Sequence, residues 1–189
     1  MRVVLLSGAI GKWSCTRTLL RYVESSLAAR GVETVFWDLR AKPLPIAVPE
    51  YHTSQNKHPD KTVREFVRTI KQADGYVLAS PLYHDSYSGV LKNALDTLPN
   101  EAFLRKPVGL VSHSSYVRSC IVPCNHLRPV VRSLGGYSAN IQVGTTDADY
   151  SADAGSLELT EPAVRARIDA MVQEIIDMAR MTPTDQQKA

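Results

Sequence analysis

The sequence predicts an α/β protein, a three-layer α/β/α sandwich around a five-stranded parallel sheet of strand order 2-1-3-4-5. Short apolar segments alternate along the chain with longer segments whose apolar residues recur at helical spacing. Such βαβ alternation produces a parallel sheet with helices on both faces. With no internal repeat and no second domain evident, residues 1–181 are expected to form one domain. The polar tail at 182–189 is expected to be disordered.

The first two strands are expected at residues 3–6 and 32–37. Between them, apolar residues at helical spacing predict a helix that ends at Gly31. Its apolar face is formed by Leu19, Leu20, Val23 and Leu27. The loop from Arg40 to Pro59 is longer than usual for a compact domain. Such a loop is either functional or a tolerated surface insertion, and the sequence leaves both interpretations open.

The middle of the chain contains two more strands, expected at residues 76–79 and 108–112. Asp60 is placed to cap the helix that precedes the third strand. The buried face of that helix is formed by Val63, Phe66, Val67 and Ile70. A helix from Ser88 to Leu98 is expected between the third and fourth strands.

The last part of the chain is expected to complete the sheet and cover it. A helix over roughly 118–134 has to bend or restart at Pro123 and Pro129, because proline lacks a backbone N–H. The fifth strand is expected at 139–143, and Pro162 opens a final helix. The apolar positions of that helix are Ile168, Met171, Val172, Ile175 and Ala179.

Composition excludes several classes of function. The chain is 44% hydrophobic and 22% charged, with a net charge of +3 and no block of like charge, so nucleic-acid binding is not expected. No apolar stretch is long enough to span a bilayer, and the apolar segment at the N-terminus is too short for a signal peptide. We therefore expect a cytoplasmic protein with no membrane partner.

The sequence contains three cysteines, which are Cys15, Cys120 and Cys124. An odd number of cysteines in a cytoplasmic protein argues against a disulfide framework. Cys120 and Cys124 have the spacing C-x-x-x-C, which is not a redox motif, and no second ligand pair lies near them in the sequence. We expect reduced thiols and no metal site.

The loop after the first strand, residues 7–17, has features of a phosphate site. Two glycines allow tight turns, and Ser14 and Thr16 lie at the start of the following helix. Backbone N–H groups, hydroxyls and the helix dipole together bind phosphate, and Lys12 or Arg17 could add positive charge. Because serine and threonine at this position are commonly plain N-caps, that interpretation stays open.

The loop after the third strand carries the most informative residues of the chain. It contains Pro81, Tyr83, Tyr87 and Gly89, which suit a flat aromatic ligand better than a metal. The alternative is that the tyrosines only fill space under the loop. In the helix that follows, Lys92 and Asp96 stand at i, i+4 and pair either within the helix or across a subunit contact.

The loop after the fourth strand, Ser112 to Tyr116, has small residues that let the backbone approach a ligand closely. His113 is either a hydrogen-bonding partner of a ligand or an ordinary surface histidine. Neither a Ser/His/Asp triad nor a pair of carboxylates can be assembled from these loops, so we assign no catalytic residue.

At these three loops together, the chain resembles the NAD(P)H-dependent FMN reductase family, which has a flavodoxin-like fold. It is most similar to the reductases of two-component alkanesulfonate monooxygenase systems. The resemblance extends from Met1 to about Asp147. The second loop carries the most specific match, formed by Ser80, Pro81, Tyr83, Ser86, Tyr87, Gly89, Leu91, Lys92 and Asp96.

The resemblance implies an FMN site built from the three loops. The implied FMN-binding residues are Ser14, Cys15, Thr16, Pro81, Leu82, Tyr83, Ser114 and Ser115. The first three would hold the phosphate, the next three would border the isoalloxazine ring, and the two serines would lie along its other polar edge. The chain departs from the family at Ala9 and Gly11, where the family has serine and arginine, and at the two serines, where it has Gly-Gly.

The resemblance also implies the activity. NADPH or NADH would pass a hydride to flavin N5, and reduced FMN would be supplied to a partner monooxygenase. The alternatives are an FMN-bound reductase of quinone, azo or nitro compounds, and a flavodoxin-like electron carrier or flavin-binding protein. A homodimer or homotetramer is implied, with the helix after Gly89 in the subunit contact.

Overall fold

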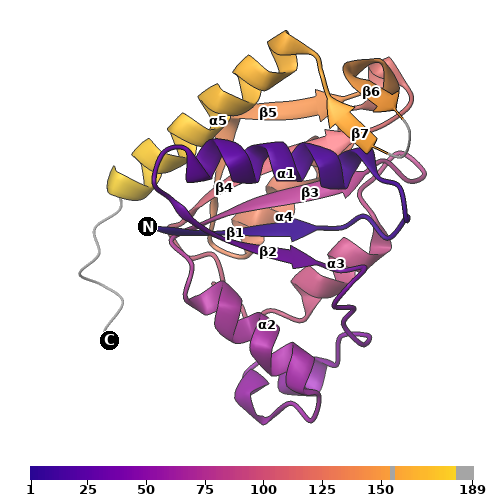
Figure 1. Ribbon diagram of the computed structural model, residues 1–189. Coiled ribbons are helices and arrows are strands. Elements are labelled where there is room, and N and C mark those ends of the chain that lie inside the picture. Colours follow the sequence, from indigo (N-terminus) through magenta and orange to yellow (C-terminus); the bar gives the residue numbers. More distant parts are fainter. Residues whose placement is uncertain (154–155, 182–189) are drawn as a thin grey trace.

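The computed structural model describes residues 1–153 and 156–181, and its centre is a five-stranded parallel sheet of order β2-β1-β3-β4-β5 (Figure 1). The strands are β1 (Arg2–Ser7), β2 (Glu33–Asp38), β3 (Gly75–Pro81), β4 (Pro107–His113) and β5 (Tyr137–Thr145). The predicted flavodoxin-like topology is therefore confirmed. The expected disorder of the tail at 182–189 concerns residues outside the described ranges.

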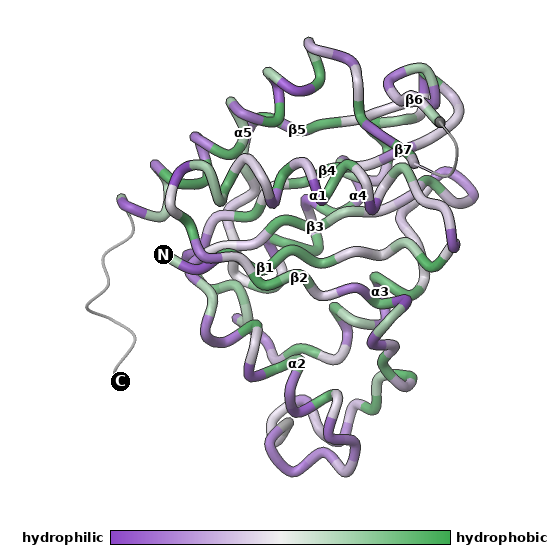
Figure 2. The backbone as a smooth tube through the Cα atoms, viewed as in Figure 1, coloured by the Kyte–Doolittle hydropathy of each residue, from purple (hydrophilic) through white to green (hydrophobic). Residues whose placement is uncertain are grey.

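Helices cover both faces of the sheet (Figure 1). One face is covered by α1 (Cys15–Ala28) and α5 (Pro162–Met181), and the other by α2 (Lys61–Lys71), α3 (Gly89–Asp96) and α4 (Val122–Ser133). Successive residues of a strand point to opposite faces, so the apolar segment of β1 contributes to two cores. Val3 and Leu5 pack beneath α1 and α5, whereas Val4 and Leu6 pack on the other side. Figure 2 shows these strands as hydrophobic segments inside a more polar periphery.

The region before α4 differs in detail from the prediction. A short 3-10 helix at Val117–Ser119 comes first, and α4 begins only at Val122. Pro123 lies in the first turn of α4, where its missing N–H costs no helical hydrogen bond. Pro129 is accommodated inside the helix. The expected interruption is thus a restart of the helix at Val122, with Pro123 in its first turn.

An antiparallel hairpin, which the sequence did not predict, follows the sheet. It pairs β6 (Tyr150–Asp153) with β7 (Ser156–Leu159). Each strand has only four residues, so its alternation of polar and apolar residues is too short to give a clear signal. Tyr150 directs its hydroxyl toward α1 and donates to the Cys15 carbonyl at 3.2 Å.

The long loop between β2 and α2 is partly structured. It contains short 3-10 helices at Pro49–Tyr51 and Gln55–Lys57. Asn93 of α3 anchors its first part, accepting from the Ala47 N–H at 2.9 Å and donating to the Pro45 carbonyl at 2.8 Å. In the described residues, no helix is both long enough and apolar enough to cross a membrane.

Candidate functional site at the carboxyl edge of the sheet

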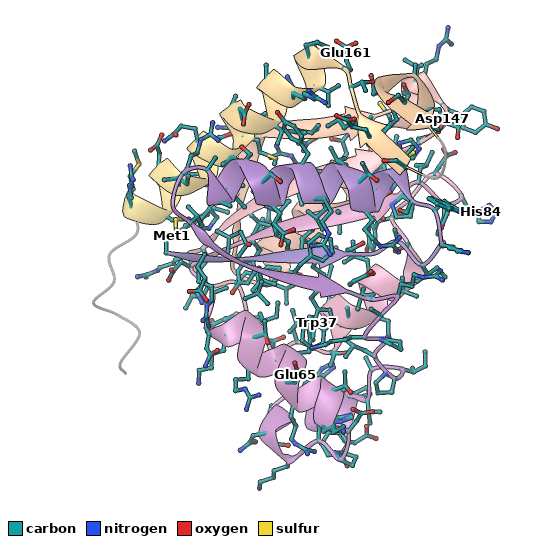
Figure 3. The ribbon with its side chains drawn as sticks, viewed as in Figure 1. Met1, Trp37, Glu65, His84, Asp147 and Glu161 are labelled. Carbon is teal, nitrogen blue, oxygen red and sulfur yellow. The ribbon has the colours of Figure 1, made fainter. Side chains whose placement is uncertain are left out.

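The loops after β1, β3 and β4 meet at one edge of the sheet, as the sequence predicted. Strand pairing sets Ser7 beside Ala79 and Pro81 beside His113. Two backbone hydrogen bonds continue the pairing into the loops, from the Gly8 N–H to the Ala79 carbonyl and from the Leu82 N–H to the His113 carbonyl, both at 2.8 Å. Figure 3 shows this edge of the molecule at His84 and Asp147, opposite Met1.

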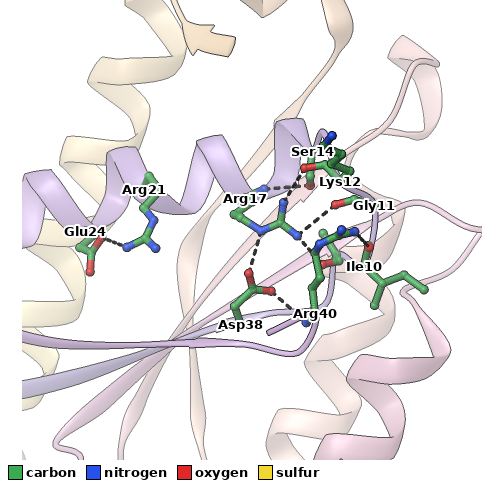
Figure 4. Close-up of polar contacts among 10 residues, drawn as sticks. Ile10, Gly11, Lys12, Ser14, Arg17, Arg21, Glu24, Asp38 and Arg40 are labelled. Atoms are coloured by element: carbon green, nitrogen blue, oxygen red, sulfur yellow. Dashed lines mark hydrogen bonds and ion pairs between the residues drawn. The ribbon is translucent and has the colours of Figure 1, made fainter. Parts of the chain in front are cut away.

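Arg17 of α1 holds the first loop in shape (Figure 4). Its guanidinium donates to the carbonyls of Ala9 at 3.0 Å, Gly11 at 3.1 Å and Lys12 at 3.3 Å. Its Nε donates to Asp38 at 2.9 Å, and each of these two side chains is only 17% exposed. Because all these donors are used, Arg17 positions the loop, and the charge that the sequence suggested for a phosphate is directed inward.

Arg40 completes the arrangement from the other side of Asp38 (Figure 4). Its side chain donates to the Ile10 carbonyl at 2.6 Å, and its backbone N–H donates to the Asp38 carboxylate at 3.0 Å. Neither Asp38 nor Arg40 was predicted from the sequence as a site residue. A usable signal was present, since Asp38 is the last residue of β2 and therefore lies at the same sheet edge as the loop after β1.

The N–H groups of the first loop remain available to a ligand. With the carbonyls of residues 9–12 bound by the two arginines, none of the backbone N–H groups of residues 10–16 donates a hydrogen bond to another described residue. Ser14 caps α1, because its hydroxyl accepts from the Arg17 N–H at 3.1 Å. Free N–H donors at a capped helix N-terminus form an anion-binding site.

The structure brings Ser14, Cys15 and Thr16 together at this helix start. The Thr16 side chain is buried, and burial raises the pKa of the half-buried Cys15 thiol. These residues therefore present their backbone N–H groups, and the Ser14 hydroxyl is engaged as the cap. Ser14 is therefore an N-cap, which was one of the two interpretations that the sequence left open. The backbone N–H groups beside it have no partner among the described residues.

The second loop is a hairpin turn closed by its own backbone. Tyr83 and Ser86 exchange two hydrogen bonds, at 2.9 Å and 3.0 Å. Between them, His84 and Asp85 adopt left-handed conformations with φ of 46° and 56°. Positive φ at both central residues is the signature of a type I′ turn. The turn leaves the Tyr83 side chain 45% exposed at the sheet edge.

Two serine hydroxyls link the end of β3, the start of α3 and the first loop. Ser80 accepts from the Ser88 N–H at 2.9 Å, and Ser88 donates to the Gly8 carbonyl at 2.8 Å. Ser88 also caps α3 through the Leu91 N–H. A Cβ at Gly8 would lie 2.7 Å from the Ser88 oxygen, so this close approach requires glycine. Further along α3, Lys92 and Asp96 pair within the helix at 2.7 Å.

The third loop uses Ser114 to shape itself. Its N–H donates to the Thr145 carbonyl at 3.0 Å, and its hydroxyl accepts from the Tyr116 N–H at 3.0 Å. Ser114 is buried, whereas Ser115 is exposed. Of the two predicted site serines, only Ser115 therefore presents its side chain to solvent.

Each of the three loops also exposes an aromatic side chain. Trp13 is 64% exposed and Tyr116 is 74% exposed, and both join Tyr83 at the carboxyl edge. Aromatic side chains offer large apolar faces to flat ligands. The arrangement thus combines an anion-binding helix start with aromatic groups, which suits a ligand that has both a phosphate and a ring system.

His113 is held at the junction of the third loop and the segment after β5. Its Nε2 lies 3.2 Å from Asp147, and its Nδ1 lies 3.2 Å from the Thr145 hydroxyl. The ring is only 13% exposed. Burial lowers its pKa, and the nearby Asp147 carboxylate opposes that effect. His113 is therefore not the ordinary surface histidine that the sequence left open.

Comparison with known proteins decides the family. The model of the NADPH-dependent FMN reductases matches residues 1–148. The chain belongs to the NADPH-dependent FMN reductase family. FMN-dependent NADPH-azoreductases of Staphylococcus haemolyticus (strain JCSC1435) and Staphylococcus aureus (strain USA300) are each 32% identical to it over 189 residues, which is 100% of this chain and of theirs.

Solved structures support the fold. An oxidoreductase of Corynebacterium diphtheriae superposes with a TM-score of 0.74 at 19% identity, covering 96% of this chain and 98% of that one. A flavoenzyme NAD(P)H:(acceptor) oxidoreductase of Paracoccus denitrificans gives a TM-score of 0.75 at 19% identity, covering 95% and 97%. The predicted family, the oxidoreductase class and the use of FMN with NAD(P)H are confirmed. The alkanesulfonate system stays a prediction.

Proposed function

We propose that this protein retains FMN and uses NADPH to reduce an aromatic acceptor of the azo or quinone class. The main support for FMN binding is the array of free backbone N–H groups at residues 10–16. Arg17 and Arg40 hold the loop that contains this array. The two azoreductase relatives named above, which match over their whole length, support the acceptor class.

The first loop fits the phosphate of FMN. N–H donors at the start of α1 and the positive end of the helix dipole stabilise a dianion. The family's arginine is replaced by Gly11, yet Arg17 reaches the Gly11 carbonyl from α1. A guanidinium thus still supports this loop, from behind rather than at the phosphate. Ser14, Cys15 and Thr16 would provide the N–H groups nearest the helix start.

The other two loops fit the ring. Pro81, Leu82 and Tyr83 continue β3 into a turn that is already closed, so their backbone needs little ordering when a ligand binds. The exposed Tyr83 ring would pack against the isoalloxazine, and Ser115, positioned by the turn at Ser114, would lie along its other polar edge. When bound, FMN supplies the hydride chemistry, and these residues orient it.

Steady-state kinetics of the purified protein test the proposal. FMN is expected to stay bound through gel filtration, and NADPH oxidation is expected to require an azo dye or a quinone in anaerobic buffer. Varying both substrates should give the parallel lines of a ping-pong reaction. NADPH oxidation that saturates with added free FMN, and is indifferent to the acceptor, would contradict the proposal.

A second candidate function is the release of reduced FMN to a partner monooxygenase. The inward direction of Arg17 favours it, because the loop then relies on neutral N–H donors for the phosphate. The same kinetics separate the two functions, since release predicts weak flavin binding and saturation by free FMN.

The proposal also covers the oligomeric state of the protein and its location in the cell. We propose a homodimer or homotetramer whose contact includes α3, where Lys92 and Asp96 are about half exposed in the single chain. Light scattering that gives the mass of one chain would contradict this. The three free cysteines fit the reducing cytoplasm.

A further inference from the structure

A thiol, an imidazole and a carboxylate converge beside the three loops, although they are far apart in the sequence. Cys15 begins α1, His113 ends β4, and Asp147 follows β5. One ligand atom from each lies within 4.8 Å of the other two. We propose that these three residues form a Zn²⁺ site. This inference does not rest on the proposed function.

The spacing of the imidazole and the carboxylate matches a tetrahedral site. His113 Nε2 lies 3.2 Å from Asp147 Oδ1. In a tetrahedral zinc site with Zn–N and Zn–O bonds of about 2.0–2.2 Å, the two ligand atoms stand about 3.3–3.6 Å apart, slightly farther than they do here. The Cys15 Sγ lies within 4.8 Å of both atoms, and it would occupy the third vertex at about 3.5 Å from each of them.

The imidazole is held in the orientation that a metal ligand needs. Its Nδ1 lies 3.2 Å from the hydroxyl of the buried Thr145, which also donates to the Ser112 carbonyl at 3.2 Å. A hydrogen bond at one ring nitrogen leaves the other as the ligand and fixes the ring plane. Tyr150 extends the network, contacting the Thr145 hydroxyl at 2.9 Å and the Cys15 carbonyl at 3.2 Å.

The donor set selects the metal. Sulfur, nitrogen and carboxylate oxygen are the ligands of zinc, and three protein ligands leave a fourth position for water. The thiolate and the carboxylate neutralise the two charges of the ion, so it would not repel the positive end of α1. The Asp147 side chain is 64% exposed and provides the route from solvent, whereas His113 is largely enclosed.

Cobalt titration of the flavin-free full-length protein tests the site directly. One equivalent of Co²⁺ should produce a thiolate-to-cobalt charge-transfer band, and Zn²⁺ should abolish it. The band should be lost in Cys15→Ser and kept in Cys120→Ser, the matched control, because Cys120 is the other half-buried thiol. No band in the wild type, or a band that survives in Cys15→Ser, would overturn the proposal.

Two further variants keep the test decisive if Cys15→Ser fails to fold. Asp147→Asn changes an exposed side chain and should weaken Zn²⁺ binding at least tenfold in a chelator competition. Thr145→Val keeps all three ligands but frees the imidazole, and should weaken binding roughly 10- to 100-fold. Wild-type affinity in Asp147→Asn, with its fold verified by circular dichroism, would exclude the carboxylate and overturn the site.

Discussion

The first and second loops occupy the same sheet edge but are built by different physical means. The first loop, residues 8–14, makes few hydrogen bonds of its own and is held by the guanidinium groups of Arg17 and Arg40 around Asp38. The second, residues 82–88, is closed by a two-residue turn, and the hydroxyls of Ser80 and Ser88 join it to its neighbours.

The difference bears on the proposed FMN site. Charged donors bind several carbonyls of the first loop at once and leave its N–H groups unpaired, as the proposed phosphate site requires. In the second loop, which is proposed to border the ring, backbone and hydroxyl hydrogen bonds fix the direction of the chain. The shape of the first loop should therefore depend mainly on Arg17, which binds three of its carbonyls, and the shape of the second on several smaller contributions.

Replacing Arg17 with Met should have the largest effect. It frees three loop carbonyls and leaves the Asp38 carboxylate without its closest cation. FMN affinity should fall about 10- to 100-fold, because charge-assisted hydrogen bonds each contribute roughly 1.5–3 kcal/mol. Riboflavin, which lacks the phosphate, should bind the variant and the wild type equally well, as measured by quenching of flavin fluorescence.

Arg21→Met provides the matched control. Arg21 lies on the same helix, pairs with Glu24 at 2.7 Å and does not contact the loop (Figure 4). Its FMN affinity should equal that of the wild type. An equal loss for FMN and riboflavin in the Arg17 variant would show that the arginine stabilises the fold generally and does not shape a phosphate site.

Ser88→Ala should be the most damaging change in the second loop. It removes the cap of α3 and leaves the Gly8 carbonyl without its donor in a buried position. Unfolding in urea should show a loss of about 1–3 kcal/mol. Ser133→Ala, at an exposed position, should change stability by less than about 0.5 kcal/mol. Equal effects of the two substitutions would refute the role given to Ser88.

Substitution of the two central residues of the turn should stabilise the protein. His84 and Asp85 both stand at positive φ, which Asn-Gly adopts with less strain. The double variant His84→Asn with Asp85→Gly should gain roughly 0.5–1 kcal/mol, which corresponds to a rise in Tm of about 1–4 °C. A lower Tm would mean that the two side chains stabilise the loop through contacts rather than strain it.

The sequence predicted the elements of the sheet and the meeting of the three loops, because apolar periodicity is a local signal and the carboxyl ends of parallel strands meet at one edge of a sheet. It did not predict Arg17 as a positioning residue. The direction of that guanidinium depends on Asp38, which only the pairing of β2 with β1 brings near. The cluster at Cys15, His113 and Asp147 was missed for the same reason, since its members come from three separate segments.

We expect the smallest effect at the cap of α2. There a charged carboxylate, that of Asp60, has the role that the neutral Ser88 hydroxyl has in α3. The Asp60 carboxylate accepts from the Thr62 N–H at 2.6 Å, and this bond is the main reason that its pKa is lowered. A depressed folded pKa stabilises the protein above the unfolded pKa of about 3.9, and the contribution is lost as pH falls through the folded value. Asp60→Asn, which still caps but does not titrate, should flatten the decline of the urea midpoint in that acid range. An unchanged decline would assign the acid sensitivity to other carboxylates, such as Glu33, whose pKa is lowered by its hydrogen bond from Arg2.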